Sequence, residues 1–259
     1  RMFMRYSGDS NLKGVGLEMG GKSPFIVLED AVLDDELIEH SAMSAFWNGG
    51  QNCSANMRQL IAAPLVDEFT GRIIKRVKAF KLGDPLDPAT DIGSMISKDH
   101  KEMVMSYIQS GVDQGAGMLI GGASKIPGYF IKPTVFENIT PEMKIAKEEI
   151  FGPVLGIMPV GSADEALRIA SDTDYGLHAT VFTQNIDQAL HMARSLPCGT
   201  VSVNGFSEGD IKTPFGGYKQ SGSLARDNGT EAIEQYLQTK TIWVQTKPGK
   251  KYYLIHQTH

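Results

Sequence analysis

Cysteine is scarce in this chain. It has two, Cys53 and Cys198, among 259 residues. Two are too few for a disulfide scaffold and too few for a zinc site built from cysteines. We therefore expect a protein of a reducing compartment, the cytoplasm, in which each cysteine is either buried filler or a reactive thiol.

Excess positive charge and long hydrophobic runs are also missing. Lysine and arginine total 25 against 30 aspartate and glutamate residues, for a formal net charge of −5. The chain thus lacks the broad basic field of nucleic-acid-binding proteins. No apolar run reaches the roughly 18 residues of a membrane span. Neither a nucleic acid nor a membrane is predicted as a partner.

Secretory and metal-binding patterns are absent as well. The first residues, "RMFMRYSGDSNLK", have no apolar core of a signal peptide, and Arg1 stands before Met2, which indicates a piece of a longer protein. The histidines form neither an HExxH pattern nor an i, i+4 pair, so we expect no metal site and only surface or helix-face roles for them. They stand at positions 40, 100, 178, 191, 256 and 259.

Short apolar segments alternate with helical patterns along most of the chain. Predicted strands cover residues 24–31, 58–64, 117–123, 129–139, 148–160, 178–184 and 199–205. Predicted helices cover residues 34–48, 65–80, 98–115, 163–174 and 185–197. Strands that alternate with helices of about a dozen residues predict βαβ units, and so an α/β domain with a mostly parallel sheet.

The pattern changes after Gly222. One helix is predicted at 227–238 and one strand, "TKTIWVQ", at 239–245, with no further helix behind it. A lone terminal strand must pair with a sheet edge, so this segment is a candidate contact between subunits.

The segment "GLEMGGKSPFIV", residues 16–27, fits the phosphate-binding pattern G-x-x-x-x-G-K-[ST]. A P-loop needs an apolar strand before it and a helix after it. Here the preceding residues are polar, and Ser23 is followed by Pro24 and an apolar segment that favours a strand. We therefore reject the P-loop, and the spacing of Gly14, Gly16 and Gly20 also fails the dinucleotide fingerprint.

Two residues remain as candidates for chemistry. Glu18 is an acid between glycines and apolar residues, where it is either a solvated loop acid or a general base with a raised pKa. Cys53 lies in "NGGQNCSAN", among glycines and small or amide side chains that let a substrate approach the backbone amides. That setting favours a nucleophilic thiol, whereas Cys198, in "LPCGT", has no such neighbours and is interpreted as filler.

Together, these segments resemble the NAD(P)-dependent aldehyde dehydrogenase superfamily. The resemblance covers about residues 12–245, and its motifs appear in the order "LEMGGKSP", "FWNGGQNCSANMR", "EEIFGPVL", "VSVNG" and "PFGGYKQSG". It implies a three-layer αβα catalytic domain with a mostly parallel sheet, plus a C-terminal oligomerisation strand. The implied boundaries are 1–17 for the end of a cofactor-binding domain or linker, 18–222 for the catalytic domain, 223–246 for the terminal helix and strand, and 247–259 for a tail.

The resemblance also implies the reaction and its residues. Cys53 stands at the position of the nucleophile and Glu18 at that of the general base. Glu149 matches the residue that binds the nicotinamide ribose, and Phe151 the residue that packs near the nicotinamide. An aldehyde would be oxidised to an acid with NAD or NADP through a thiohemiacetal and a thioester, in a homodimer or homotetramer. Because the pyrophosphate and adenosine contacts of the family lie upstream of its glutamate motif, we expect this chain alone to bind cofactor weakly and to form no NAD(P)H.

The substrate is the least determined part. Asn204 matches a residue beside the active site of the family, and Glu208 and Asp210 fall in a loop near its substrate entrance. Acids there favour cationic aldehydes such as aminoaldehydes, or simply solvate the loop. The sequence also resembles the aminoaldehyde and γ-glutamyl-aminobutyraldehyde branch. A cysteine–histidine hydrolase and a catalytically silent assembly domain remain as alternatives.

Overall fold

The structure, a computed structural model, describes residues 1–224, 226–244 and 246. Its centre is a seven-stranded sheet with the order β4-β5-β6-β3-β2-β8-β9. Neighbouring strands are parallel except for the edge pair β4 and β5. The strands are β2 (Pro24–Val27), β3 (Arg58–Ala62), β4 (Gly117–Ala123), β5 (Ile131–Glu137), β6 (Val154–Val160), β8 (His178–Phe182) and β9 (Thr200–Val203).

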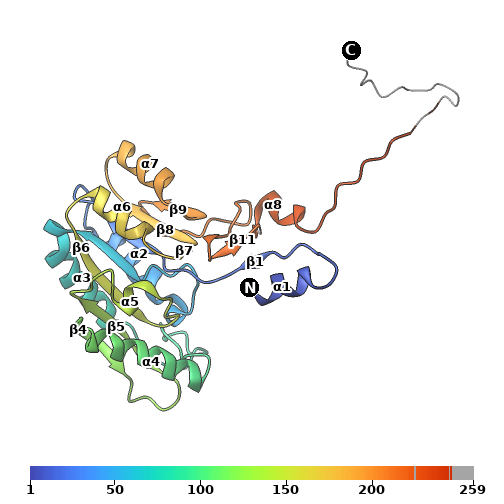
Figure 1. Ribbon diagram of the computed structural model, residues 1–259. Helices are drawn as coiled ribbons and strands as arrows, with labels where there is room; N and C mark the ends of the chain where they lie inside the picture. The colour runs from blue at the N-terminus through green and yellow to red at the C-terminus, as the bar shows by residue number, and fades with distance from the viewer. Residues whose placement is uncertain (225, 245, 247–259) are drawn as a thin grey trace.

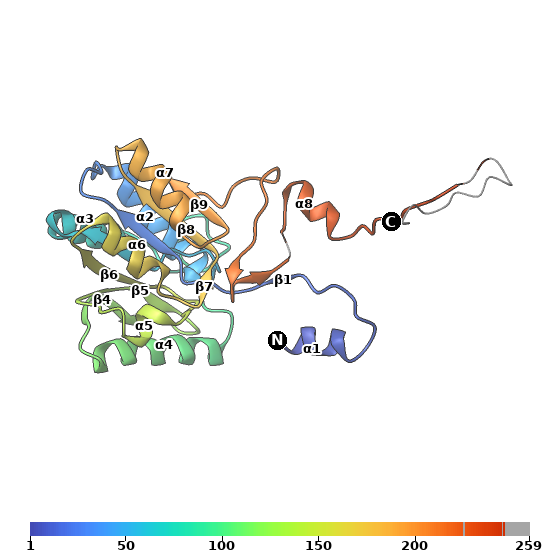
Figure 2. The same cartoon turned by 45° about the horizontal axis from the view of Figure 1, so that its top comes forward.

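Helices cover both faces of this sheet, as Figures 1 and 2 show. They are α2 (Asp35–Phe46), α3 (Val66–Lys78), α4 (Lys98–Asp113), α5 (Lys144–Lys147), α6 (Ala163–Ser171) and α7 (Ile186–Ser195). Phe25 and Val27 of β2 pack with apolar side chains of α2 and α3, whereas Ile26 packs on the other face with side chains of α4, α6 and α7. Successive residues of a strand point to opposite faces, so a strand buried on both is apolar throughout. The predicted three-layer α/β fold is confirmed.

Four helices begin at polar side chains that cap them. The side-chain oxygens of these residues accept from backbone amides of the first turn, which no carbonyl inside the helix can reach. The capping residues are Asp34 for α2, Ser97 for α4, Ser162 for α6 and Asn185 for α7. Each start agrees within about one residue with the start predicted from the sequence.

Two short antiparallel ribbons lie beside the central sheet. Strand β1 (Leu17–Glu18) pairs with β11 (Gly222–Ser223), and β7 (Tyr175–Gly176) pairs with β10 (Tyr218–Lys219). The helices α1 (Met2–Gly8) and α8 (Gly229–Glu234) lie off the sheet at the ends of these segments (Figure 1). The sequence did not predict α1, because its side chains, apart from Ser7, are exposed and leave no apolar stripe.

The predicted terminal strand at 239–245 is not formed within the described residues. Residues 239–244 make no strand pairing, and Ile242 and Trp243 are 76% and 86% exposed. A strand requires a neighbouring strand to bond to, and the described residues offer none at that point. The preceding helix is also shorter than the predicted 227–238. Pairing with another subunit stays a prediction, and Gln245 and the tail 247–259 lie outside the described residues.

Candidate active site

The candidate site lies where the parallel strands of the sheet begin. Three segments meet there: residues 18–23 before β2, residues 51–57 before β3 and residues 149–152 before β6. A methyl group at Gly21 would overlap the carbonyl oxygen of Cys53, and the Gly21 amide donates to Glu149 Oε1 at 3.0 Å. The first segment is therefore wedged between the other two.

A sharp turn places Cys53 between α2 and β3. The short helix η1 (Trp47–Gly50) has Asn48, Gly49 and Gly50 at φ of 53°, 64° and 70°, in the left-handed region that favours glycine. Gly50 also packs against the carbonyl of Gly152, where a Cβ would lie 2.5 Å from the oxygen. The glycines of the predicted cysteine motif thus serve the backbone turn that presents the thiol.

Cys53 is half-buried, and its Sγ lies 3.8 Å from Asn52 Oδ1. Burial raises the pKa of the thiol, the charges of Glu208 and Glu149 raise it further, and the amides of Cys53 and Ser54 act in the opposite direction. Within the described residues, no acceptor takes the Cys53 amide and no histidine bonds the sulfur. The raised pKa favours the thiol form of Cys53, and its amide has no acceptor among the described residues.

Glu149 is held at a fixed place beside the cysteine loop. Its carboxylate occupies the space in which a side chain at Gly20 would lie, and one oxygen accepts from the Gly21 amide. Burial raises the pKa of Glu149, whereas the Gly21 amide and the charge of Lys22 oppose that shift. Oε2 accepts no hydrogen bond from the described residues, so it remains available to a ligand hydroxyl.

Phe151 is held by a histidine that the sequence interpretation did not single out. Its backbone is left-handed, with φ of 53°, and its carbonyl accepts from His100 Nε2 at 2.6 Å. The two rings meet edge to face with centroids 6.0 Å apart. His100 stands in the first turn of α4, and nothing in its local sequence indicates this contact.

Glu18 lies on the same segment as Gly20 and forms part of β1, where it pairs with Gly222 of β11. Its side chain is exposed, and no contact with Cys53 exists within the described part of the chain. Partial desolvation and the charge of Asp227 raise the pKa of Glu18 to about 7, with Arg226 acting against them. A carboxylate with this pKa exchanges protons near neutral pH, as a general base must.

The loop after β9 carries the three residues predicted for the substrate pocket. Glu208 is half-buried and accepts from Asn52 Nδ2 at 2.9 Å and from the Ser54 hydroxyl. Asp210 is exposed and accepts from the Lys212 amide. Of the three, Glu208 alone contacts the cysteine loop within the described residues.

Asn204 directly follows β9, at the end of the strand that lies away from Cys53. Its amide group bonds both the amide and the carbonyl of Thr183, at 3.0 and 2.9 Å. These bonds tie the end of β9 to the end of β8, opposite the edge at which Cys53 lies. The structure thus gives Asn204 a bracing contact, and its role in a substrate pocket stays a prediction.

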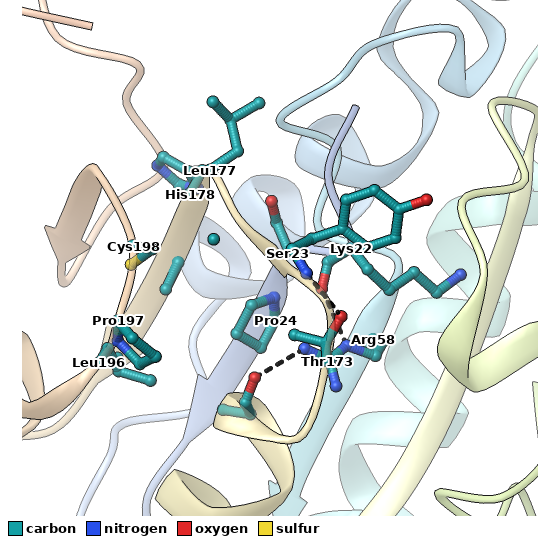
Figure 3. A pocket seen from close by; sticks show the side chains of 14 residues that line it. Lys22, Ser23, Pro24, Arg58, Thr173, Leu177, His178, Leu196, Pro197 and Cys198 are labelled. Carbon is teal, nitrogen blue, oxygen red and sulfur yellow. Dashed lines mark hydrogen bonds between the residues drawn. The ribbon is translucent and has the colours of Figure 1, made fainter. Parts of the chain in front are cut away.

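Buried cations stand behind the site, in the pocket drawn in Figure 3. Arg58 donates to the carbonyls of Lys22, Ile169 and Ala170 at 2.9, 3.0 and 2.9 Å, and burial lowers its pKa to about 10. Lys22 extends away from His178 and Cys198 in Figure 3, and its ammonium has no acceptor among the described residues. Burial and the nearby Arg58 lower the pKa of Lys22 to about 7, against the charges of Glu149 and Glu148.

Three further predictions from the sequence concern residues near this edge of the sheet: the P-loop pattern, Cys198 and His178. Lys22 and Ser23 lead into β2 rather than a helix, which confirms the rejection of a P-loop. Burial raises the pKa of Cys198 to about 12, which supports its interpretation as filler. The expectation of a surface or helix-face role is wrong for His178, which lies on β8, is 1% exposed, and has its pKa lowered to about 4 by burial.

Two kinds of feature are absent from the described residues. They contain no group of three or more histidine, cysteine, aspartate or glutamate side chains arranged to hold a metal ion. Their helices include none with the length and apolar character needed to cross a bilayer.

An α/β fold that places a cysteine near a glutamate held by a backbone amide is typical of the catalytic domain of an enzyme. Comparison with known proteins identifies the family. A profile of the aldehyde dehydrogenase family matches residues 1–242. The chain belongs to the aldehyde dehydrogenase family.

Individual relatives support that membership. The chain is 41% identical over 244 residues to an aminoacetaldehyde dehydrogenase from Pseudomonas aeruginosa, with 94% of this chain and 49% of the relative covered. It is 42% identical to the aldehyde dehydrogenase KauB from the same organism, with a TM-score of 0.91 over 94% of this chain and 50% of that one. An indole-3-acetaldehyde dehydrogenase from P. syringae, solved with NAD+ and IAA, is 40% identical at the same TM-score and coverage. The chain spans about half the length of these relatives.

Proposed function

We propose that this chain is the catalytic part of an enzyme that oxidises an aldehyde to a carboxylic acid with NAD+ or NADP+. The main support is the packing of Gly21 between Cys53 and Glu149, which brings a thiol and a carboxylate together. Family membership and the solved NAD+ complex of a relative agree with this reaction. Glu18, an acid with a pKa of about 7, is the proposed general base.

The residues present fit the nicotinamide side of such a cofactor. Glu149 has one carboxylate oxygen held by the Gly21 amide and the other free to accept from ribose hydroxyls. Phe151, fixed by His100, offers an aromatic surface to the nicotinamide ring. When bound, the nicotinamide accepts the hydride that leaves the substrate carbon. The chain's own part is to hold that ring against the thiol.

Cys53 and its amide perform the first step of the proposed chemistry. The thiolate of Cys53 bonds to the aldehyde carbon, and the carbonyl oxygen becomes an oxyanion that accepts from the Cys53 amide. Loss of hydride leaves a thioester on Cys53. Glu18 then takes a proton from a water molecule, whose oxygen bonds to the carbon while the carbon–sulfur bond breaks. One aldehyde, one water and one oxidised cofactor thus give one acid, one reduced cofactor and one proton.

We also propose that the substrate is an aminoaldehyde. The relative named aminoacetaldehyde dehydrogenase supports this class. Asp210 is exposed in the loop after β9, and its negative charge favours a substrate with an ammonium group. Initial rates with aminoaldehydes and neutral aldehydes of equal length test it, and equal kcat/KM for both sets would contradict it.

The proposed enzyme assembles as a homodimer or homotetramer in the cytoplasm. The exposed apolar side chains of residues 242–244 support an assembly role for the terminal segment. A cysteine hydrolase has less support, because no histidine contacts Cys53 among the described residues. A catalytically silent assembly domain has less support as well, because such a domain does not require a thiol near a carboxylate that a backbone amide holds in place.

Reduced-cofactor formation by the full-length enzyme tests the proposed reaction. Cys53→Ala is expected to abolish turnover, whereas Cys198→Ala, which removes the other half-buried thiol, is expected to retain it. Normal turnover in Cys53→Ala would exclude the assigned nucleophile. Ester hydrolysis without any cofactor, and no oxidation with it, would instead support the hydrolase.

A further inference from the structure

Glu208 is bonded to both sequence neighbours of Cys53. Its Oε1 accepts from Asn52 Nδ2 at 2.9 Å and from the Ser54 hydroxyl. Asn52 Oδ1 in turn accepts from the Ser54 amide at 3.3 Å, and the Ser54 hydroxyl lies 3.2 Å from it. The side chains of Asn52, Ser54 and Glu208 are thus hydrogen-bonded to one another next to the cysteine, whose Sγ is 3.8 Å from Asn52 Oδ1.

The segment that carries Glu208 is itself anchored to the sheet. The carbonyl of Ser207 accepts from Ser202 Oγ at 2.6 Å and from the buried His178 Nε2 at 2.9 Å. The ring of His178 also meets that of Phe206 edge to face, with centroids 5.2 Å apart. Because these contacts fix the residues before Glu208, the carboxylate is held in place from β8 and β9 rather than free in solvent.

We propose that Glu208 is a positioning residue that clamps the nucleophile loop on both sides of Cys53, at Asn52 and at Ser54. The inference rests on the proposed role of Cys53 as nucleophile. It gives Glu208 the role of holding the nucleophile loop instead of a role in direct substrate binding. The clamp keeps Asn52 and Ser54 bonded to each other, so the Cys53 amide between them keeps one direction. Asp210 is then the acid of this loop left to attract a cationic substrate.

The clamp also places a negative charge beside the thiol. The charged groups that act on Cys53 are Glu208, from the loop after β9, and Glu149, from the segment before β6, and the Cys53 and Ser54 amides oppose them. Both carboxylates raise the pKa of the thiol, after burial itself. Removing the charge of Glu208 while keeping its shape must therefore increase the thiolate fraction at a given pH.

Alkylation of Cys53 by iodoacetamide, followed by mass spectrometry of the 259-residue chain, measures this without any turnover. Glu208→Gln keeps an oxygen that can accept from Asn52 and Ser54 but removes the charge. We expect its labelling rate at neutral pH to rise roughly fivefold, the factor for a unit charge a few ångströms away in a watery setting. At high pH, where all Cys53 is thiolate, wild type and Glu208→Gln should label equally.

Glu208→Ala separates position from charge. It removes both, so we expect the faster labelling at neutral pH and, in addition, a changed rate at high pH because the loop is no longer clamped. Asp210→Asn, in the same loop without contact to the cysteine loop, is the matched control and should keep the wild-type profile. Identical pH profiles for wild type, Glu208→Gln and Glu208→Ala would overturn the proposal.

Measurements on the full-length enzyme distinguish a failure of the proposed Glu208 clamp from a failure of the proposed Cys53 nucleophile. If Glu208→Ala lowers kcat and Glu208→Gln restores it with little change in KM, positioning is supported. If the labelling profiles shift as expected but Cys53→Ala still oxidises aldehydes, the clamp stands and the proposed nucleophile is wrong. If Glu208→Ala and Glu208→Gln raise KM for aminoaldehydes alone and leave labelling unchanged, Glu208 is a substrate residue instead.

Discussion

The α-carbon of Gly21 lies so close to the Cys53 carbonyl that no side chain fits between them. The same glycine donates its amide to Glu149. A single residue without a side chain therefore sets the distance between the segment before β2 and the nucleophile loop. The glycines of the "LEMGGKSP" motif serve this approach of two backbones rather than a phosphate group.

Gly21→Ala should move the nucleophile loop, because its methyl group would overlap a backbone oxygen that has no flexible side chain to yield. We expect the free energy of unfolding to fall by roughly 1–3 kcal/mol, measured by urea denaturation, together with a changed rate of Cys53 alkylation. Gly71→Ala is the control, since a Cβ at this exposed position of α3 meets nothing within 4 Å. It should be neutral or stabilising, and equal behaviour of the two variants would contradict the packing.

Glu18→Gln should block the second half of the proposed reaction. In the full-length enzyme, we expect kcat to fall about 10²–10⁴-fold, while a burst of one reduced cofactor per site remains because the thioester still forms. The wild-type kcat should rise with pH through about 7, where Glu18 becomes a carboxylate. Glu29→Gln, at the other end of β2, is the control. Unchanged turnover in Glu18→Gln would remove this residue from the mechanism.

Lys22 should make the stability of the chain depend on alkaline pH. Its pKa is about 7 in the folded chain and about 10.5 in the unfolded one, so the unfolded chain binds more protons between these values. The free energy of unfolding should therefore increase from pH 7 to pH 9.5, by about 3 kcal/mol more in wild type than in Lys22→Met. Chemical denaturation at several pH values measures this. Lys125→Met, an exposed control, should follow wild type, and parallel curves for Lys22→Met would refute the prediction.

His178 should make the stability of the chain depend on acidic pH. Its pKa is about 4 when folded and about 6.5 when unfolded, so protons favour the unfolded chain as the pH falls through this range. Wild type should lose about 3 kcal/mol of unfolding free energy that His178→Gln does not lose. Thermal or urea unfolding between pH 7 and pH 4 checks this. His191→Gln, exposed on α7, should lose as much as wild type, and an equal loss in His178→Gln would show that its titration does not matter.

Elements that carry their own local signal were predictable. The apolar run at 24–27 predicted a strand, and the helix starts predicted at residues 98, 163 and 185 lie within one residue of the observed ones. The rejection of a P-loop needed only Pro24 and the strand after it. The terminal strand at 239–245 was not recovered, because a strand depends on a neighbour that this sequence segment does not encode.

Contacts between distant segments were not predictable in the same way. Glu208 and Asn52 are 156 residues apart. Their local sequence indicates only a substrate acid for Glu208 and a small polar neighbour of Cys53 for Asn52. His178 looks like any polar residue in an alternating strand, yet β8 is buried on both faces. The contact of His100 with Phe151 depends on how α4 packs, which residue order alone does not specify.

The site lies at the edge where the strands begin, and this has a consequence for the product. The helices α2, α6 and α7 run back to this edge and end there, while α4 begins there beside Phe151. The C-terminal ends of α2, α6 and α7 carry partial negative charge, whereas the N-terminal end of α4 carries partial positive charge. Glu149 and Glu208 add negative charge near Cys53. For the proposed reaction, an uncharged aldehyde group becomes a carboxylate, so the negative charges of Glu149 and Glu208 repel that carboxylate, favour its departure and oppose the return of the acid.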